Sequence, residues 1–372
     1  MWIIAGVGLA AASLVAYGVV SGAMETPGWL ESECVYLGCG EGPAAALQGD
    51  PAGPYRWCMM GEYLEESGEK QAATVCFRRA VELGRGVPPV LMRVANSYLG
   101  RGENAEAVAL MRDVLGQVSV YDGVIFGSYR RLGVPVAEVL DSGLPDDGRV
   151  WKAYFEDLLG SGEVDEAALA WGKMGERGYR DDELAGRYAG YLLRHKLYDK
   201  AVTTWAEQLD GRADGYPEKN RVYNGDFERE LSGNPLDWRL RAPQGVEVER
   251  VGEGWEGSHA LALRFDGSRN VVLRGVSVVV PVGAGRYRFR ARMKTEGMTT
   301  DRGVYLLVHA GGRELWRSKE LIGTNEWREF EAVVRVRRTA PVMIELRREE
   351  SLRIDNKVWG TVWLDGVELA PL

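Results

Sequence analysis

A set of six mostly apolar positions, which alternates large and small side chains, recurs at a fixed interval in the first half of the sequence. The first copy comprises Trp57, Gly61, Leu64, Ala73, Phe77 and Ala80, and the second comprises Leu91, Ala95, Tyr98, Ala107, Met111 and Val114. Two later copies, separated from each other by the same interval, comprise Trp151, Phe155, Leu158, Ala167, Trp171 and Met174, then Ala185, Ala189, Leu192, Ala201, Trp205 and Gln208. Small residues let two helices approach closely, and large ones fill the space between neighbouring units. The spacing therefore predicts a stack of paired helices.

Turn-forming segments fall between the two halves of the clear copies, at ESGEK, GRGEN and GSGEV. The arrangement resembles the tetratricopeptide repeat family, whose unit is a 34-residue pair of antiparallel helices. The resemblance covers about residues 54–210, and we expect the helical domain to span 54–211. Between the second and third copies, Ala137 lies midway between Ala107 and Ala167 and closer to each than one full repeat, which indicates a shortened, degenerate unit. About five helix pairs are therefore expected.

The resemblance also implies a function for the helical stack. Stacks of this family curve into a superhelix whose concave surface holds a protein partner. The candidate contact residues lie on the first helix of each pair and point away from the packing positions: Arg56, Asn96, Lys152 and Arg187. A solvated helix face is the competing interpretation for each of them.

The stretch from Met1 to Met24 contains no charged side chain, and a helix of that length would cross the hydrocarbon core of a bilayer. We expect residues 1–24 to be an uncleaved transmembrane anchor and residues 25–53 to be an irregular lead-in. The expected location is the inner membrane, single-pass, with the bulk of the chain periplasmic or otherwise outside the cytoplasm. A cleaved signal segment remains an alternative, because Ser21 and Ala23 give a small-x-small pattern. A body that faces the cytoplasm is the other alternative, because the flanking charges fix the orientation only weakly.

The charge distribution argues against a nucleic-acid partner. Up to Arg221 the chain carries 22 basic and 32 acidic residues, and from Val222 onward it carries 24 basic and 22 acidic residues. Nucleic-acid binding depends on a basic surface that neutralises phosphates, and neither half of the sequence supplies a large excess of basic residues.

The sequence also carries no catalytic or zinc-binding signature. The four cysteines, Cys34, Cys39, Cys58 and Cys76, lack zinc-finger spacing, and their disulfide state is left open. The three histidines have no nucleophile, zinc-protease or phosphate-binding motif beside them. We therefore expect a non-enzymatic protein.

The hydrophobic pattern changes from helical to alternating beyond a polar linker at residues 212–221. Six alternating runs follow, at 270–282, 285–294, 303–310, 329–338, 341–349 and 360–371. With ALALRF at 260–265 and the segment that opens at Val222, about eight strands are expected. The fold class is therefore multidomain α + β, with an antiparallel β-sandwich over residues 222–372.

The order of features in this second half resembles the jelly-roll carbohydrate-binding modules. The matching features are NGDFE at 224–228, Trp238, YRFRARMKTEG at 287–297, Trp327 before a strand, and LDGVEL at 364–369. The resemblance implies that the opening acidic residue and the closing Asp meet at a structural calcium ion. The residues at the matching positions are Glu228 and Asp365, with Asn224 and Asp226 as additional candidates. Turn capping is the alternative role, because calcium needs six to eight oxygens.

The resemblance further implies binding of glycan on exposed aromatic rings, and Trp316 and Trp359 are the candidate residues. Alternation also places the basic residues of 286–294 on one strand face, where they would meet either an anionic polysaccharide or acidic neighbours in the sheet. The prediction is a membrane-anchored adaptor in bacterial polysaccharide assembly or export. A purely structural assembly protein and a glycan-processing enzyme are the alternatives.

Overall fold

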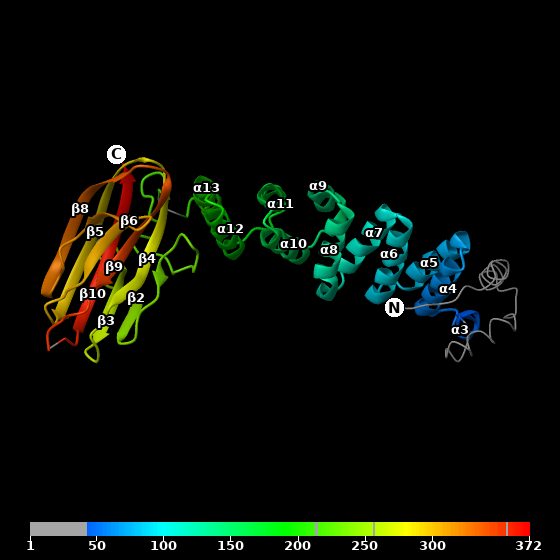
Figure 1. Cartoon of the computed structure of the whole chain (residues 1–372), viewed down its shortest axis with the longest axis horizontal. Helices are drawn as coiled ribbons and strands as arrows, with labels where there is room; N and C mark the ends of the chain where they lie inside the picture. The colour runs from blue at the N-terminus through cyan, green and yellow to red at the C-terminus, as the bar shows by residue number, and fades with distance from the viewer. Residues whose placement is uncertain (1–42, 213–214, 256, 355) are drawn as a thin grey trace. The chain divides into compact units, whose positions relative to one another are not determined.

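The computed structural model of the chain describes residues 43–212, 215–255, 257–354 and 356–372. It is an α + β protein in which helices come first and two antiparallel sheets follow (Figure 1). The chain divides into two compact units, of which the first ends at Tyr179 and the second begins at Arg180. Within the described ranges no helix is long and apolar enough to cross a membrane. The anchor predicted at residues 1–24 lies outside these ranges, as do Cys34 and Cys39.

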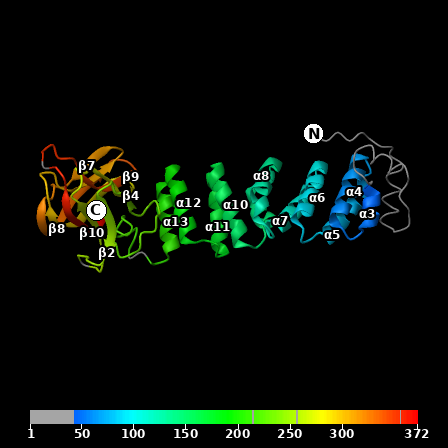
Figure 2. The same cartoon turned by 90° about the horizontal axis from the view of Figure 1, so that it is seen from below.

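The first unit consists of paired helices that lie side by side (Figure 2). Its elements are α3 (Pro43–Gly49), α4 (Pro54–Glu66), α5 (Lys70–Leu83), α6 (Pro88–Arg101), α7 (Asn104–Leu115), η1 (Ser119–Tyr121), α8 (Asp122–Leu132), α9 (Val136–Glu138), η2 (Val139–Gly143), α10 (Gly148–Ser161) and α11 (Val164–Glu176). The prediction of helical repeats is confirmed, since helix pairs begin close to residues 54, 88 and 148.

Close approach within each pair follows from the small residues of the repeat. A Cβ added at Gly61 of α4 would lie 2.7 Å from Cε1 of Phe77 on α5, so the ring packs directly on the backbone of its partner helix. Ala73, Ala107 and Ala167 at the corresponding crossing points are fully buried. Burial of the large repeat positions, such as Trp151 and Phe155, then supplies the apolar area that stabilises the stack.

The third helix pair is shortened, as the spacing of Ala137 predicted. Helix α8 is followed by only three α-helical residues in α9 and then by η2, a single π-helical turn. Tyr129 of α8 closes this turn by donating its hydroxyl to the carbonyl of Gly143 at 2.9 Å.

The second unit combines one more helix pair with a β-sandwich (Figure 1). The helices are α12 (Asp182–Arg194) and α13 (Tyr198–Leu209), and the strands are β1 (Arg239–Leu240), β2 (Val246–Val251), β3 (Ala260–Asp266), β4 (Leu273–Val282), β5 (Gly285–Met298), β6 (Tyr305–Ala310), β7 (Arg313–Arg317), β8 (Gly323–Val336), β9 (Ala340–Arg348) and β10 (Trp359–Pro371). The strand order is β1-β4-β9-β6-β7 in one sheet, here called sheet A, and β2-β3-β10-β5-β8 in the other, here called sheet B.

Alternating side chains from both sheets form the sandwich core. On β5 the residues Tyr287, Phe289, Ala291 and Met293 point inward, and on β10 Val362 and Leu364 do the same. All seven predicted runs from residue 260 onward coincide with strands, whereas β1, β2 and β7 were not predicted.

The segment that opens at Val222 is not a strand, and this expectation was wrong. Asn224 and Phe227 have φ values of 52° and 53°, in the left-handed region that an extended strand cannot include. The segment forms turns instead and is joined to β10, where the amide of Val367 donates to the carbonyl of Gly225 at 2.8 Å. A Cβ at Gly225 would lie 2.0 Å from the Val367 carbonyl oxygen, so only glycine allows this approach.

The helix pair α12–α13 packs on this opening segment. The Tyr223 ring meets Trp205 of α13 edge-on with centroids 5.4 Å apart, and Tyr216 lies 5.5 Å from Tyr223 on another side. A Cβ at Gly190 of α12 would lie 3.0 Å from Cγ of Pro235. Tyr216, which lies in the stretch predicted as a linker, is therefore packed and only 9% exposed.

Candidate functional site

The two residues predicted to bind calcium hold one loop, the connection between β2 and β3. Asp365 accepts a hydrogen bond from the amide of Trp255 at 2.6 Å. Glu228 accepts one from the amide of His259 at 2.8 Å and contacts its ring Nδ1 at 3.0 Å. Two carboxylates from the ends of the sandwich sequence therefore fix the loop that carries Trp255.

Burial governs the charge state of Asp365, which is 3% exposed. The pKa of this carboxyl is raised to about 6, chiefly by desolvation and also by the negative charges of Asp226 and Glu228, although two backbone hydrogen bonds lower it. Burial also raises the pKa of Glu228, but hydrogen bonds from His259 outweigh it and bring the net value below its usual range.

The remaining calcium candidates have other roles in the opening turns. The side-chain oxygen of Asn224 accepts from the amide of Arg229 at 3.1 Å, and Asp226 accepts from the amide of Glu228 at 3.4 Å. Among the described residues, no group of three or more His, Cys, Asp or Glu side chains is arranged to hold a metal ion. The side chains present do not by themselves make a calcium site, and calcium binding stays a prediction.

Trp359, one of the two predicted glycan-binding residues, is an exposed and firmly held ring. Its side chain is 56% exposed at the start of β10. A Cβ at Gly297 would lie 2.5 Å from its Cζ3 atom and one at Gly267 would lie 3.4 Å from its Cδ1 atom, so the indole rests on two glycine backbones. Both glycines have positive φ, at 63° and 75°, which side-chain-bearing residues rarely adopt. Thr299 fixes the main chain by accepting from the Trp359 amide at 2.8 Å.

Trp316, the other predicted glycan-binding residue, packs against the sandwich core. Its ring centroid lies 5.1 Å from that of Phe289 and 6.4 Å from that of Phe330. Its side chain is only partly exposed, so its ring faces are largely used by protein contacts.

A second group of indoles lies on the outer face of sheet B. Trp363 of β10 packs with Trp327 of β8 and with Ala260 and Ala262 of β3. Trp255 lies 6.1 Å from Trp327, centroid to centroid, and is 44% exposed. The sequence analysis did not select Trp255 and Trp327, because each is an isolated aromatic residue outside any strand alternation that would show its direction.

Arg288, Arg290 and Arg292 of β5 lie on this same outer face and are paired with acidic residues. Arg292 contacts Glu329 of β8 at 2.8 Å, and Arg290 contacts Glu331 of β8 at 3.5 Å and Glu368 of β10 at 3.7 Å. Of the two interpretations of this row, the structure supports pairing within the sheet.

The four predicted partner-binding residues of the helical repeats lie on the first helix of their pairs. Arg56, Asn96 and Arg187 are exposed, and Lys152 is half-buried. Arg187 contacts Glu183 at 2.8 Å, one helical turn earlier on α12. Elsewhere the first helices are joined by ion pairs such as Arg93 with Glu62 and Arg149 with Asp122. This surface is polar and charged.

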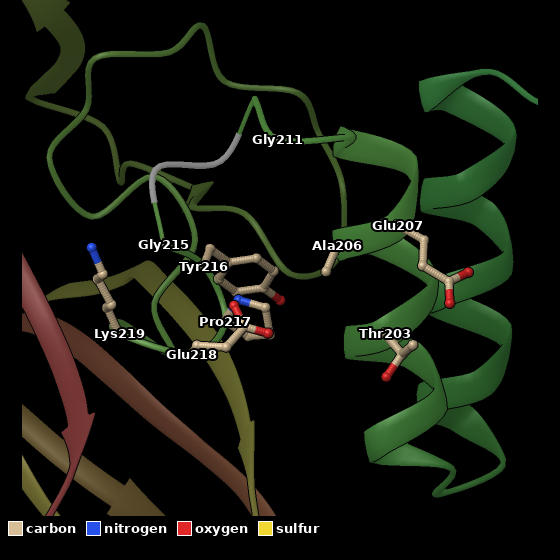
Figure 3. Close-up of a pocket in the computed structure, with 9 residues that line it drawn as sticks. All are labelled: Thr203, Ala206, Glu207, Gly211, Gly215, Tyr216, Pro217, Glu218 and Lys219. Atoms are coloured by element: carbon tan, nitrogen blue, oxygen red, sulfur yellow. The ribbon is translucent and has the colours of Figure 1, made fainter.

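A hollow of about 740 Å³ lies between α13 and the segment that follows it. Figure 3 shows the residues that line it. Thr203 and Glu207 line it from the helix, while Tyr216, Pro217 and Lys219 line it from the segment. Thr203, Glu207 and Lys219 are exposed.

Comparison with known proteins finds weak similarities to solved structures. No protein-family model matches the chain, and no curated protein matches it. Among solved structures, TmCBM61 in complex with β-1,4-galactotriose is similar at 20% identity and a TM-score of 0.31, over 42% of this chain and 100% of that chain.

The CBM22-1 xylan-binding domain of Paenibacillus barcinonensis Xyn10C is similar at 14% identity and a TM-score of 0.28, over 40% of this chain and 91% of that one. YrrB, a TPR protein with an unusual peptide-binding site, is similar at 14% identity and a TM-score of 0.24, over 46% of this chain and 92% of that one. At TM-scores below 0.5 these similarities carry no argument. Any proposal about function therefore rests on the geometry of the chain itself.

Proposed function

We propose that the chain is a non-enzymatic adaptor in which the β-sandwich, as a jelly-roll carbohydrate-binding module, binds glycan and the helical repeats bind a protein partner. The observation that carries the glycan half is Trp359. Its indole lies against the backbones of Gly267 and Gly297, and the residue is 56% exposed.

A ring held in this way suits a sugar ligand. Sugars present C–H groups on the faces of their rings, which pack on an aromatic plane, while their hydroxyls need donors and acceptors around the edge. Because glycine backbones already fix the indole, binding costs little side-chain entropy. The exposed Thr299 and Lys357 side chains lie in the neighbouring loops and offer such polar groups.

The protein-binding half rests on the exposed first helices of the repeats. Their surface carries exposed polar and charged residues, such as Asn96 and Arg56. A polar surface of this kind fits a partner segment that is itself charged. Attachment to the membrane through residues 1–24 and a place in polysaccharide assembly or export complete the proposal.

A glycan array probed with the full chain tests the glycan half. We expect binding to a defined set of oligosaccharides, loss of about tenfold or more in affinity for Trp359→Ala, and near-normal binding for Trp359→Phe, which keeps an aromatic plane. Leu352→Ala is the matched control, because Leu352 is 95% exposed on a neighbouring loop. Equal loss in the control, or an array without any signal from folded protein, would reject the glycan half.

The enzyme alternative has a separate test. The bound oligosaccharides are incubated with the full chain and analysed by mass spectrometry, and we expect them unchanged. Product that accumulates with time, and that disappears when a carboxylate of the chain is neutralised, would establish the enzyme instead.

A further inference from the structure

We propose that Trp359 is one end of a binding track that runs along β10 on the outer face of sheet B to Trp255, and that the track takes a chain of several sugar units. This inference rests on the glycan binding proposed above and specifies the length of the ligand.

The geometry of β10 places the track on one face. Val362 and Leu364 point into the core, so the alternate residues Trp359, Thr361 and Trp363 point outward together. Successive residues on a strand rise about 3.3 Å, which puts the Trp359 and Trp363 backbones roughly 13 Å apart. Asp365, roughly 20 Å from Trp359 on the same count, is hydrogen-bonded to the amide of Trp255.

The far end of the track is an aromatic corner. Trp255 meets Trp327 edge-on with centroids 6.1 Å apart, and the Arg292 guanidinium lies 5.6 Å from the Trp255 centroid. The two carboxylates that fix the loop, Asp365 and Glu228, keep the partly exposed Trp255 at this position. Each end of the track therefore has an indole that the fold holds in place.

The middle of the track is polar. Lys294 lies over the buried Trp363 ring, with Nζ 5.0 Å from its centroid, and Thr361 stands beside it. Arg264 and Glu249 pair on the neighbouring strands of the same face, as do Arg292 and Glu329. Because these charges are compensated inside the sheet, the face offers hydrogen-bonding groups without a strong field of one sign.

The two separated indoles and the polar residues between them indicate which class of ligand fits the track. No single sugar ring spans the separation of the two indoles, so only a chain can touch both of them and the polar middle. A sheet face with paired charges suits hydroxyl groups better than rows of carboxylates. The ligand class is therefore an unbranched oligosaccharide or polysaccharide whose units are mainly uncharged.

Titration calorimetry with the full chain tests the track, with β-1,4-linked gluco-, xylo- and manno-oligosaccharides from single sugars to hexasaccharides as probes. We expect affinity to rise with length. Trp359→Ala should weaken short and long ligands alike. Trp255→Ala should weaken only the long ones, by about tenfold, which corresponds to about 1.4 kcal/mol.

Val333→Ala is the control, because Val333 is 56% exposed on β8 and lies away from the track. Thermal melts check that each variant is folded, and Trp327→Phe gives a second, milder change at the same corner. Affinity that is independent of length, or a Trp255→Ala variant that binds hexasaccharides normally, overturns the track while leaving a glycan site at Trp359. Absence of binding to every probe overturns the track, and the glycan array then decides whether a glycan site at Trp359 remains.

Discussion

The helix pairs α10–α11 and α12–α13 follow one repeat pattern but have different neighbours. In the first pair, Trp171 of α11 packs against Phe155 of α10, with ring centroids 5.5 Å apart. In the second, Trp205 of α13 occupies the same repeat position and packs against Tyr223 of the segment that opens the sandwich. The same side chain thus closes a helix pair in one case and joins a helix pair to a β-domain in the other.

The glycines of the two pairs differ in the same way. A Cβ added at Gly172 of α11 would meet nothing within 4 Å, whereas one added at Gly190 of α12 would meet Pro235. The comparison teaches that a repeat pattern specifies how two helices pair, while glycines outside the pattern show where a further segment packs on them.

The largest expected effect on stability comes from replacing Trp205 or Trp171 with alanine. Trp205→Ala should lower the free energy of unfolding of the second unit by about 3–5 kcal/mol, because a large buried ring is lost. Hydrogen exchange should speed up in α12–α13 and in the sandwich strands together. Trp171→Ala should speed up exchange in α10–α11 instead.

The decisive region in this experiment is the sandwich. If β4 and β10 keep their protection in Trp205→Ala while α12 and α13 lose theirs, the helix pair and the sandwich are separate folding units, and the comparison drawn above is broken.

The next effect concerns the glycines. Gly172→Ala should stabilise its helix by about 0.5–1 kcal/mol, since alanine has the higher helix propensity and the site is open. Gly190→Ala should not show this stabilisation, because its Cβ would lie 3.0 Å from Cγ of Pro235. Denaturant unfolding of both variants measures the difference.

A double-mutant cycle sharpens this test. Pro235→Ala removes the ring atom that Gly190→Ala would meet, so the double variant should recover most of the lost stability. Strictly additive effects would show that Pro235 does not limit the space at α12.

A third effect depends on pH. The pKa of Asp365 is raised to about 6 in the folded chain, so the folded state binds this proton more tightly than the unfolded state does. The resulting stability is fully present below about pH 4 and is lost as pH rises through 6, a change of about 3 kcal/mol at most. Asp365→Asn should remove this dependence from the melting of the second unit, α12–α13 included, and leave α10–α11 unaffected.

Calcium probes the same carboxyl group. If Glu228 and Asp365 bind the ion as the family resemblance implies, millimolar CaCl₂ should raise the melting temperature at pH 7 in the unmodified chain and not in Asp365→Asn. An unchanged melting temperature would leave the two carboxylates with the loop contacts that the structure shows.

The smallest effect is expected at the surface. Arg212, just after α13, makes a two-pronged contact with Asp182 of α12 at 2.8 and 2.9 Å, and its hydrogen bonds lower the pKa of Asp182. Stability from this pair is present above the usual Asp range and is lost as pH falls through the lowered value. Both side chains are about half exposed, so Asp182→Asn should cost about 0.5 kcal/mol, measured by denaturant unfolding and reduced by high salt. A loss several times larger would show that the pair is better shielded than its exposure indicates.

The helices and most strands could be predicted because their signals are local. The repeat of small and large residues follows from contacts within one pair, such as Gly61 with Phe77, and alternation on β5 follows from one buried face. The strand predicted at Val222 failed because Asn224 and Phe227 take left-handed conformations, although the Asn-Gly-Asp sequence there is typical of turns. The contact of Gly190 with Pro235 has no periodic signal, so sequence spacing could not show it.

Only those parts of the candidate site that have a local sequence signal could be predicted. Trp359 begins a strand whose alternation can be followed, and it is exposed as expected. Trp316 has the same residue type but meets Phe289 and Phe330, which only the pairing of strands brings near it. Trp255 reaches the outer face through a loop fixed by Asp365, a partner 110 residues away in sequence.

The aromatic contact between Tyr223 and Trp205 also limits where such a chain can recombine in evolution. A recombination event at the polar stretch after α13 would leave two aromatic surfaces without cover, one on each product, and both would be prone to aggregate. Exchange at Arg180 would keep those rings together. Descendants that exchange their β-sandwich are therefore expected to inherit the last helix pair with it.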